Sequence, residues 1–138
     1  MVDDALTYAA HDPDMSHLPV ILVVEDDPDV REYAVQVCTD LGAPVFEAAD
    51  ATRALELLQQ HPEINVLFSD IQMPPGMSGI ELAGEAWKLN PRLHLVLTSG
   101  ALGTSPLKDV TFLRKPYHTA DLVYAVMAIS GQAKNTAA

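Results

Sequence analysis

Short apolar runs alternate with stretches of helical periodicity along most of this chain. Residues 20–24 (VILVV) form a run of apolar, mostly β-branched side chains, which is typical of a strand buried on both faces. Comparable segments at 43–48, 64–68, 93–97 and 111–114 predict further strands, and most intervening stretches carry apolar side chains at helical spacing. Strands that alternate with helices form parallel sheets with helices on both faces. The pattern therefore predicts an α/β fold with a doubly wound, five-stranded parallel sheet in the order 2-1-3-4-5.

Capping residues mark where three of the predicted helices begin. Asp27 followed by Pro28 supplies an N-cap and a first-turn proline for the first of them. Asp50 supplies an N-cap for the second helix, and Ser78 with Glu81 has the pattern of a capping box for the third. These signals place the helices between the strands, as a doubly wound sheet requires.

The chain is long enough for one domain with a buried core, since it has 138 residues of which 49% are hydrophobic. We predict that residues 18–131 form this domain, which ends in an amphipathic helix carrying Leu122, Val126 and Ile129. The polar residues 1–17 predict a flexible N-terminal extension. The small, polar residues 132–138 predict a disordered tail.

Charge and cysteine content indicate the compartment and disfavour several classes of partner. The formal net charge of −11 repels phosphate backbones, so we expect no direct binding of nucleic acid. No apolar run is long enough to span a bilayer, so we expect no membrane insertion. The single cysteine, Cys38, excludes an internal disulfide and suits a reducing compartment. These features predict a cytoplasmic protein.

Acidic side chains follow two of the predicted strands. Glu25, Asp26 and Asp27 come after the first strand, and Asp70 comes after the third. In the predicted strand order these two strands are neighbours, so Glu25, Asp26 and Asp70 should converge at one edge of the sheet. Converging carboxylates repel one another unless they are protonated or bind a hard cation such as Mg²⁺. Asp27 is better explained as the helix cap, because a proline follows it.

Two further polar residues lie at the carboxyl ends of the fourth and fifth predicted strands, on the same edge of the sheet. Thr98 ends the fourth strand and Lys115 ends the fifth. A lysine there supplies a positive charge for a phosphoryl oxygen, and a hydroxyl supplies a hydrogen-bond donor. Each residue alone is ordinary. Acids, a hydroxyl and a lysine on successive strand ends together indicate a phosphoryl-binding site.

The chain resembles the receiver domain of two-component response regulators from about residue 20 to residue 129. Four stretches carry the resemblance: ILVVEDDPDVRE, LFSDIQMPPGMSGIEL, VLTSG and FLRKPY. The resemblance implies the flavodoxin-like receiver fold. It also implies that Asp70 accepts a phosphoryl group from a histidine kinase or a histidine phosphotransfer protein, and that the domain signals by changed binding to a downstream target protein.

The resemblance assigns roles to the residues at the predicted edge. Asp26 would bind Mg²⁺ directly, Glu25 would bind it through water, and the backbone carbonyl of Gln72 would join Asp70 to complete the protein ligands. Lys115 would contact the phosphoryl group, and the peptide bond before Pro116 would be cis, as is common in the family.

A switch is implied by the same resemblance. Thr98 would move to bond the phosphoryl group after transfer, and Phe112 would fill the space that it leaves. Phe112 stands where many receivers have a tyrosine. Two other departures are an extra proline in residues 73–79 (MPPGMSG), with Ser78 replacing the usual aspartate, and a short stretch between the fourth and fifth strands. Glycine and proline crowd residues 100–106, so the fourth helix of a typical receiver should be short or irregular here.

Several functional readings remain open at this point. The first is a phosphorylatable receiver that stands alone and is not an enzyme. A receiver-shaped adaptor that is never phosphorylated, and a receiver excised from a hybrid histidine kinase, are the alternatives. A haloacid-type phosphatase is discounted, because it would need a second aspartate two residues after the nucleophile, where Gln72 stands.

Overall fold

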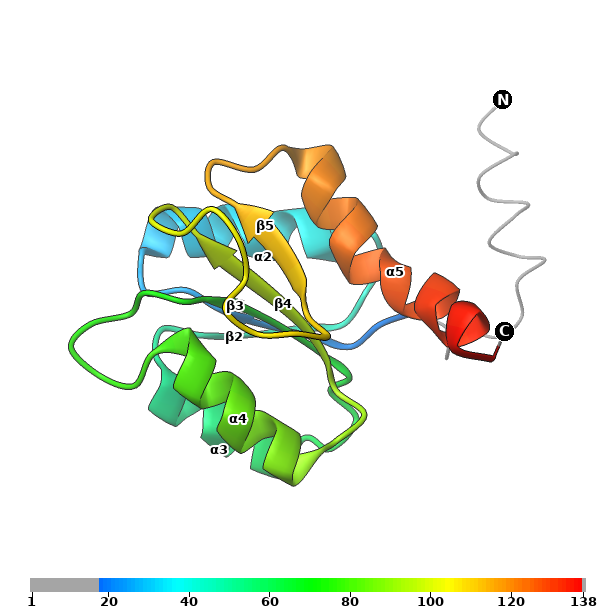
Figure 1. Cartoon of the computed structure of the whole chain (residues 1–138), viewed down its shortest axis with the longest axis horizontal. Coiled ribbons are helices and arrows are strands. Elements are labelled where there is room, and N and C mark those ends of the chain that lie inside the picture. The colour runs from blue at the N-terminus through cyan, green and yellow to red at the C-terminus, as the bar shows by residue number, and fades with distance from the viewer. Residues whose placement is uncertain (1–17, 138) are drawn as a thin grey trace.

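Five parallel strands form the centre of the structure, in the order β2-β1-β3-β4-β5. The computed structural model describes the backbone of residues 18–137 and the side chains of residues 18–128, so the extension predicted for residues 1–17 lies outside the described residues. The strands are β1 (Ile21–Val24), β2 (Val45–Ala48), β3 (Val66–Asp70), β4 (His94–Ser99) and β5 (Thr111–Arg114). The predicted fold class and strand order are confirmed (Figure 1).

Two strands differ from the predicted bounds in a way that matters for the site. Strand β3 was expected at residues 64–68, but the backbone N–H of Ile64 donates to the carbonyl of His61 and closes a turn after the preceding helix. The strand therefore begins later and includes Asp70 as its last residue. Strand β4 likewise extends through Thr98. Both side chains thus lie on regular strands rather than in the loops that follow.

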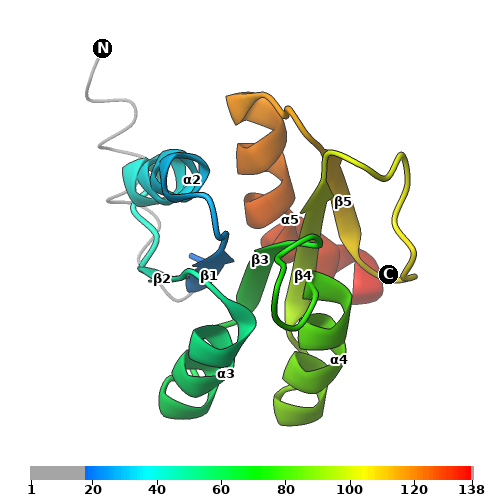
Figure 2. The same cartoon turned by 90° about the vertical axis from the view of Figure 1, so that its left-hand side faces the viewer.

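The helices cover the sheet in two pairs, α2 (Pro28–Asp40) with α5 (Thr119–Ala137) and α3 (Ala51–Gln60) with α4 (Gly79–Leu89). Figure 2 shows α2 and α5 on one face of the sheet and α3 and α4 on the other. Alternate residues of each buried strand supply the two cores: Leu22 and Leu67 face α3 and α4, whereas Val23 and Phe68 face α2 and α5. This is the two-sided burial that apolar parallel strands require.

The predicted helix starts are all present. Asp27 accepts hydrogen bonds from two backbone N–H groups of α2, and Asp50 accepts one from α3. Ser78 and Glu81 form the reciprocal hydrogen bonds of a capping box at the start of α4. Each cap satisfies backbone donors that the first turn of a helix leaves unpaired.

The segment between β4 and β5 and the C-terminal end of the chain complete the fold. Residues 100–110 contain no helix, in agreement with the prediction for this segment. Helix α5 continues to Ala137, and the disordered tail at residues 132–138 stays a prediction. Within the described residues, no helix is both long and apolar enough to cross a membrane.

Candidate functional site

Three carboxylates meet at the edge of the sheet where the strands end. Glu25 and Asp26 follow β1, and Asp70 ends β3, the strand that pairs with β1. Oxygen atoms of these three side chains all lie within 4.8 Å of one another. Glu25 and Asp70 are buried, with 4% and 6% of their surface exposed, whereas Asp26 is exposed. The predicted convergence is therefore present in the structure.

Asp27 does not join this group. Its carboxylate accepts hydrogen bonds from the first turn of α2, and its own backbone N–H donates to Oε2 of Glu25 over 3.2 Å. The prediction that Asp27 is a helix cap is confirmed, and the hydrogen bond to Glu25 links this cap to the carboxylate cluster.

Lys115 reaches the carboxylates from the end of β5. Its Nζ donates to Oε1 of Glu25 over 2.9 Å and lies 3.2 Å from Oδ2 of Asp70. The Lys115–Pro116 peptide bond is cis, as predicted. The lysine therefore bridges the two buried carboxylates.

Burial and neighbouring charges shift the pKa values of Glu25 and Lys115, the two partners of this ion pair. Burial raises the pKa of Glu25, and the charge of Asp70 adds to the rise while the hydrogen bond to Lys115 opposes it. For Lys115, burial acts to lower the pKa, but the hydrogen bond to Glu25 and the charge of Asp70 outweigh it and raise the pKa. Lys115 therefore stays protonated at neutral pH.

The donor set fits a hard divalent cation. Three carboxylates face one ammonium group, so positive charge is in deficit at the cluster. All the converging atoms are oxygens, which are the ligands that Mg²⁺ prefers. The backbone N–H of Gln72 donates to Oδ1 of Asp70 over 3.4 Å. The carbonyl of Gln72 stays a predicted ligand.

Thr98 and Phe112 occupy the strands beyond Asp70. Thr98 pairs in register with Asp70 across β3 and β4 and is buried. Its backbone carbonyl accepts a hydrogen bond from Ile71 over 2.9 Å. Phe112 lies half-buried on the edge strand β5, opposite Leu97. The structure brings Thr98 beside Asp70 and leaves Phe112 one strand farther away.

The comparison with known proteins agrees with this geometry. A family model described as the response regulator receiver domain matches residues 21–127. The chain belongs to the response regulator receiver family. Phosphoryl acceptance in two-component signalling is the general function of this family.

Individual proteins that resemble this chain are also receivers. The response regulator receiver protein CpdR of Brucella abortus (strain 2308) is 37% identical over 109 residues, which cover 75% of this chain and 89% of that protein. The crystal structure of the receiver domain from the hybrid histidine kinase CckA superposes with a TM-score of 0.71 at 32% identity, covering 80% of this chain and 97% of that one. A receiver domain from Clostridium thermocellum has a TM-score of 0.77 at 23% identity, covers 86% of this chain and 99% of its own, and supports the fold.

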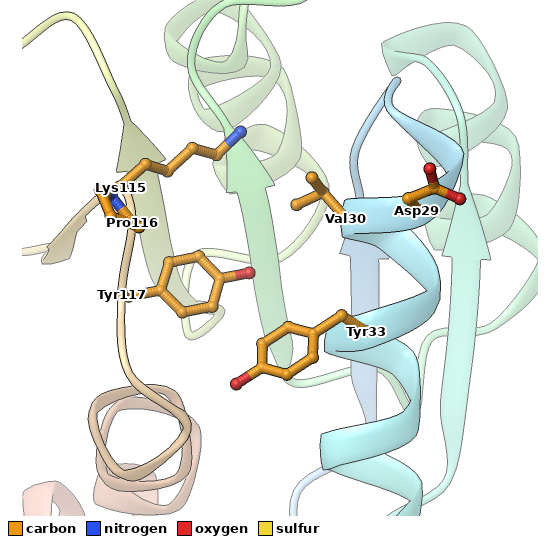
Figure 3. A pocket seen from close by; sticks show the side chains of 6 residues that line it. All are labelled: Asp29, Val30, Tyr33, Lys115, Pro116 and Tyr117. Atoms are coloured by element: carbon orange, nitrogen blue, oxygen red, sulfur yellow. The ribbon is translucent and has the colours of Figure 1, made fainter.

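An open groove adjoins the carboxylates of this receiver. It encloses about 520 Å³ between the start of α2 and the segment after β5, and its lining consists of Asp29, Val30, Tyr33, Lys115, Pro116 and Tyr117. Figure 3 shows the two tyrosine rings side by side below the Lys115 side chain. Their centroids are 6.2 Å apart, and the hydroxyl of Tyr33 hydrogen-bonds to Thr119 at the start of α5. The groove is mainly apolar and lies directly beside the charged site.

Other reactive side chains have structural roles. Cys38 is buried, and burial raises the pKa of its thiol to about 11. The indole N–H of Trp87 donates to the carbonyl of Leu93 over 3.1 Å, and the partly buried side chain packs against the core. The ring of the buried His94 lies 3.3 Å from the carbonyl of Ala125, and burial lowers its pKa.

Gly79 lets the start of α4 approach the backbone of Asp70, a role not predicted from the sequence. Its backbone N–H donates to the carbonyl of Ile71 over 2.8 Å, which brings the start of α4 against the end of β3. A Cβ atom at this position would lie 2.1 Å from the carbonyl oxygen of Asp70. Only glycine can stand so close to the Asp70 backbone, because the Cβ atom of any other residue would overlap the carbonyl oxygen. The glycine that follows the Ser78 cap was the available signal in the sequence.

We expect Gly79→Ala to lower the free energy of unfolding by about 1–3 kcal/mol, because the backbone around Asp70 must move to admit the methyl group. Gly84→Ala is the matched control, since a Cβ at Gly84 meets nothing within 4 Å. Alanine in the middle of α4 should stabilise by about 0.5–1 kcal/mol. Urea unfolding of the two variants and the parent measures both changes. Equal stability of the two variants would contradict the close approach.

Proposed function

We propose that this receiver accepts a phosphoryl group on Asp70 from a histidine kinase or histidine phosphotransfer protein, with Mg²⁺ bound beside it. The carrying observation is the convergence of Glu25, Asp26 and Asp70 with Lys115 at one strand edge. The protein then acts as a phosphoacceptor that signals by changed protein–protein binding, rather than as an enzyme with a separate substrate. An adaptor that is never phosphorylated would have no need of this charge arrangement.

The side chains suit the transfer step. An oxygen of Asp70 forms the new bond to phosphorus, while the P–N bond of the donor phosphohistidine breaks and its electron pair stays on the imidazole nitrogen. Charge accumulates on the phosphoryl oxygens, so nearby cations favour the transfer. Lys115 already lies 3.2 Å from Asp70 and can neutralise part of this charge. Bound Mg²⁺ would supply the rest, held by Asp26 and Asp70, by Glu25 through water, and by the Gln72 carbonyl.

The groove beside Lys115 is where we place the donor protein. A phosphohistidine must come within bonding distance of Asp70, so its carrier must cover this edge of the sheet. The exposed apolar surface next to the site is the groove that contains Tyr33, of which 41% is exposed. Phosphotransfer assays with the histidine kinases of the source organism test the partner.

We also propose a cytoplasmic location, without membrane insertion or direct contact with nucleic acid.

With Mg²⁺ and acetyl phosphate, the purified protein should gain one phosphoryl group, and Asp70→Asn should abolish the gain because the attacking carboxylate oxygen is lost. Mass spectrometry and mobility on a phosphate-binding gel follow the modification. Asp29→Asn is the control, since Asp29 is an acid near the site but outside the carboxylate cluster. Phosphorylation of Asp70→Asn at the parental level would rule out this acceptor.

We expect Asp26→Ala to lose Mg²⁺ affinity and Asp27→Ala to keep it, because only Asp26 belongs to the carboxylate cluster. Asp27→Ala should instead lose about 1 kcal/mol of stability, as expected for removal of a helix cap. Calorimetric Mg²⁺ titration and urea unfolding separate the two effects. Equal losses of affinity would mean that Asp27 takes part in binding the metal.

We further propose that Thr98 and Phe112 convert phosphorylation into a change of surface. Thr98 pairs with Asp70, so its hydroxyl can turn toward a phosphoryl oxygen and leave space behind it. Phe112 has no hydroxyl, so packing alone can favour its inward position, by about 1–3 kcal/mol if its burial becomes complete. The response would reach residues 100–110, which precede Phe112 and lead into β5.

Beryllofluoride, which mimics the phosphoryl group, should shift the amide resonances of Phe112 and of residues 100–110, because Thr98 connects them to Asp70. Thr98→Ala should remove these distant shifts, whereas Thr98→Ser should keep them because the hydroxyl is retained. A titration followed by amide NMR makes the measurement. Shifts confined to the surroundings of Asp70 in the parent protein would contradict the switch.

A further inference from the structure

Arg31 connects three elements next to the carboxylate cluster. It lies in the second turn of α2, and its Nη1 donates to the backbone carbonyl of Glu25 over 2.8 Å. Its Nε donates to Oε1 of Glu47, on β2, over 3.1 Å. The side chain is mostly buried, with 20% of its surface exposed. The guanidinium group is thus held at two points, a geometry that its planar, forked donors suit.

These contacts fix the backbone where β1 ends. The N–H of Glu25 donates to the carbonyl of Ala48 over 3.1 Å and continues the ladder with β2. The carbonyl of the same residue is held by Arg31. The peptide between Glu25 and Asp26 is therefore bound on its carbonyl side by a charged donor, and its orientation sets the direction in which each neighbouring carboxylate leaves the chain.

We propose that Arg31 is a positioning residue for the metal-binding acids, an inference that rests on the proposed Mg²⁺ site. Like-charged carboxylates within 4.8 Å repel one another. A free peptide could rotate to let Asp26 swing away into solvent. The hydrogen bond from Arg31 opposes this rotation and keeps both acids directed toward Asp70 before any cation arrives.

A purely electrostatic role predicts the opposite result. Arg31 carries a positive charge near the site, so its removal would strengthen the binding of a divalent cation if charge alone mattered. A positioning role predicts weaker binding, because residues that orient metal ligands typically change affinity by about 10–100-fold when they are lost. The sign of the change in affinity therefore distinguishes the two roles.

The test is a calorimetric Mg²⁺ titration of the full chain with Arg31→Met, Arg31→Lys and Arg53→Met. Arg31→Met should lose about tenfold in affinity. Arg31→Lys should lose less Mg²⁺ affinity than Arg31→Met but still bind more weakly than the parent, because one ammonium group cannot donate to Glu25 and Glu47 in the forked geometry of a guanidinium group. Arg53→Met removes an equal charge from an exposed ion pair on α3 and should bind as the parent does. Unchanged or tighter binding by Arg31→Met would overturn the proposal.

Amide hydrogen exchange without Mg²⁺ provides a second readout. Arg31→Met should speed exchange at Glu25 and Asp27, whose N–H groups donate to Ala48 and to the Glu25 side chain, and leave Leu67 in β3 unchanged. Faster exchange at Leu67 as well would indicate general destabilisation and overturn a local role. If the parent protein binds no Mg²⁺, the proposed metal site fails, and unchanged exchange at Glu25 and Asp27 would separately refute the role of Arg31. Should Arg31→Met fail to fold, Arg31→Lys decides both measurements.

Discussion

The parallel pairing of β1 with β3 is the constraint on which the rest of the site depends. Val24 pairs with Ser69, so the next residue on each strand, Glu25 and Asp70, must emerge side by side. Both strands are buried on two faces, and the apolar side chains that alternate along them fix the register. A shift by one residue would turn Phe68 and Leu67 into the wrong cores. The hydrophobic pattern therefore enforces the approach of two like charges.

That approach costs free energy, which the surrounding structure offsets. Lys115 bridges the two buried carboxylates, the Asp27 N–H donates to Glu25, and the Gln72 N–H donates to Asp70. Of these donors only Lys115 carries a positive charge, so the charge of the cluster is neutralised only in part. Under the proposed function, a bound cation or phosphoryl group would change the charge balance at the strand edge, and would shift a conformational equilibrium of the domain through its differential interaction with two states. The unfavourable charge arrangement would then make the domain sensitive to phosphorylation.

The sequence was sufficient for those features that depend on local chemistry or on strand adjacency. The caps at Asp27 and Ser78 follow from side-chain hydrogen bonding within one turn, and the convergence of Glu25 with Asp70 follows from strand order. The close approach of Gly79 to Asp70 could not be predicted in this way, because it depends on how near α4 comes to β3. The reach of Arg31 to the Glu25 carbonyl depends on the orientation of α2 in the same way. The start of β3 at Val66 was missed because the turn at Ile64 is apolar and looks like strand.

The residue after Thr98 gives a physical path from the site to the surface. Ser99 is buried, and its hydroxyl donates to Oε1 of Gln72 over 2.7 Å. The hydroxyl oxygen of Ser99 in turn accepts hydrogen bonds from the backbone N–H groups of Ala101 and Leu102. Ser99 thus connects the loop after Asp70 to the first residues of the irregular segment 100–110. Because this segment lacks the internal hydrogen bonds of a helix, displacing Ser99 moves a few backbone groups rather than a rigid element. In the proposed switch, a small movement at Thr98 would therefore change the exposed surface at lower energetic cost than a shift of an entire helix would require.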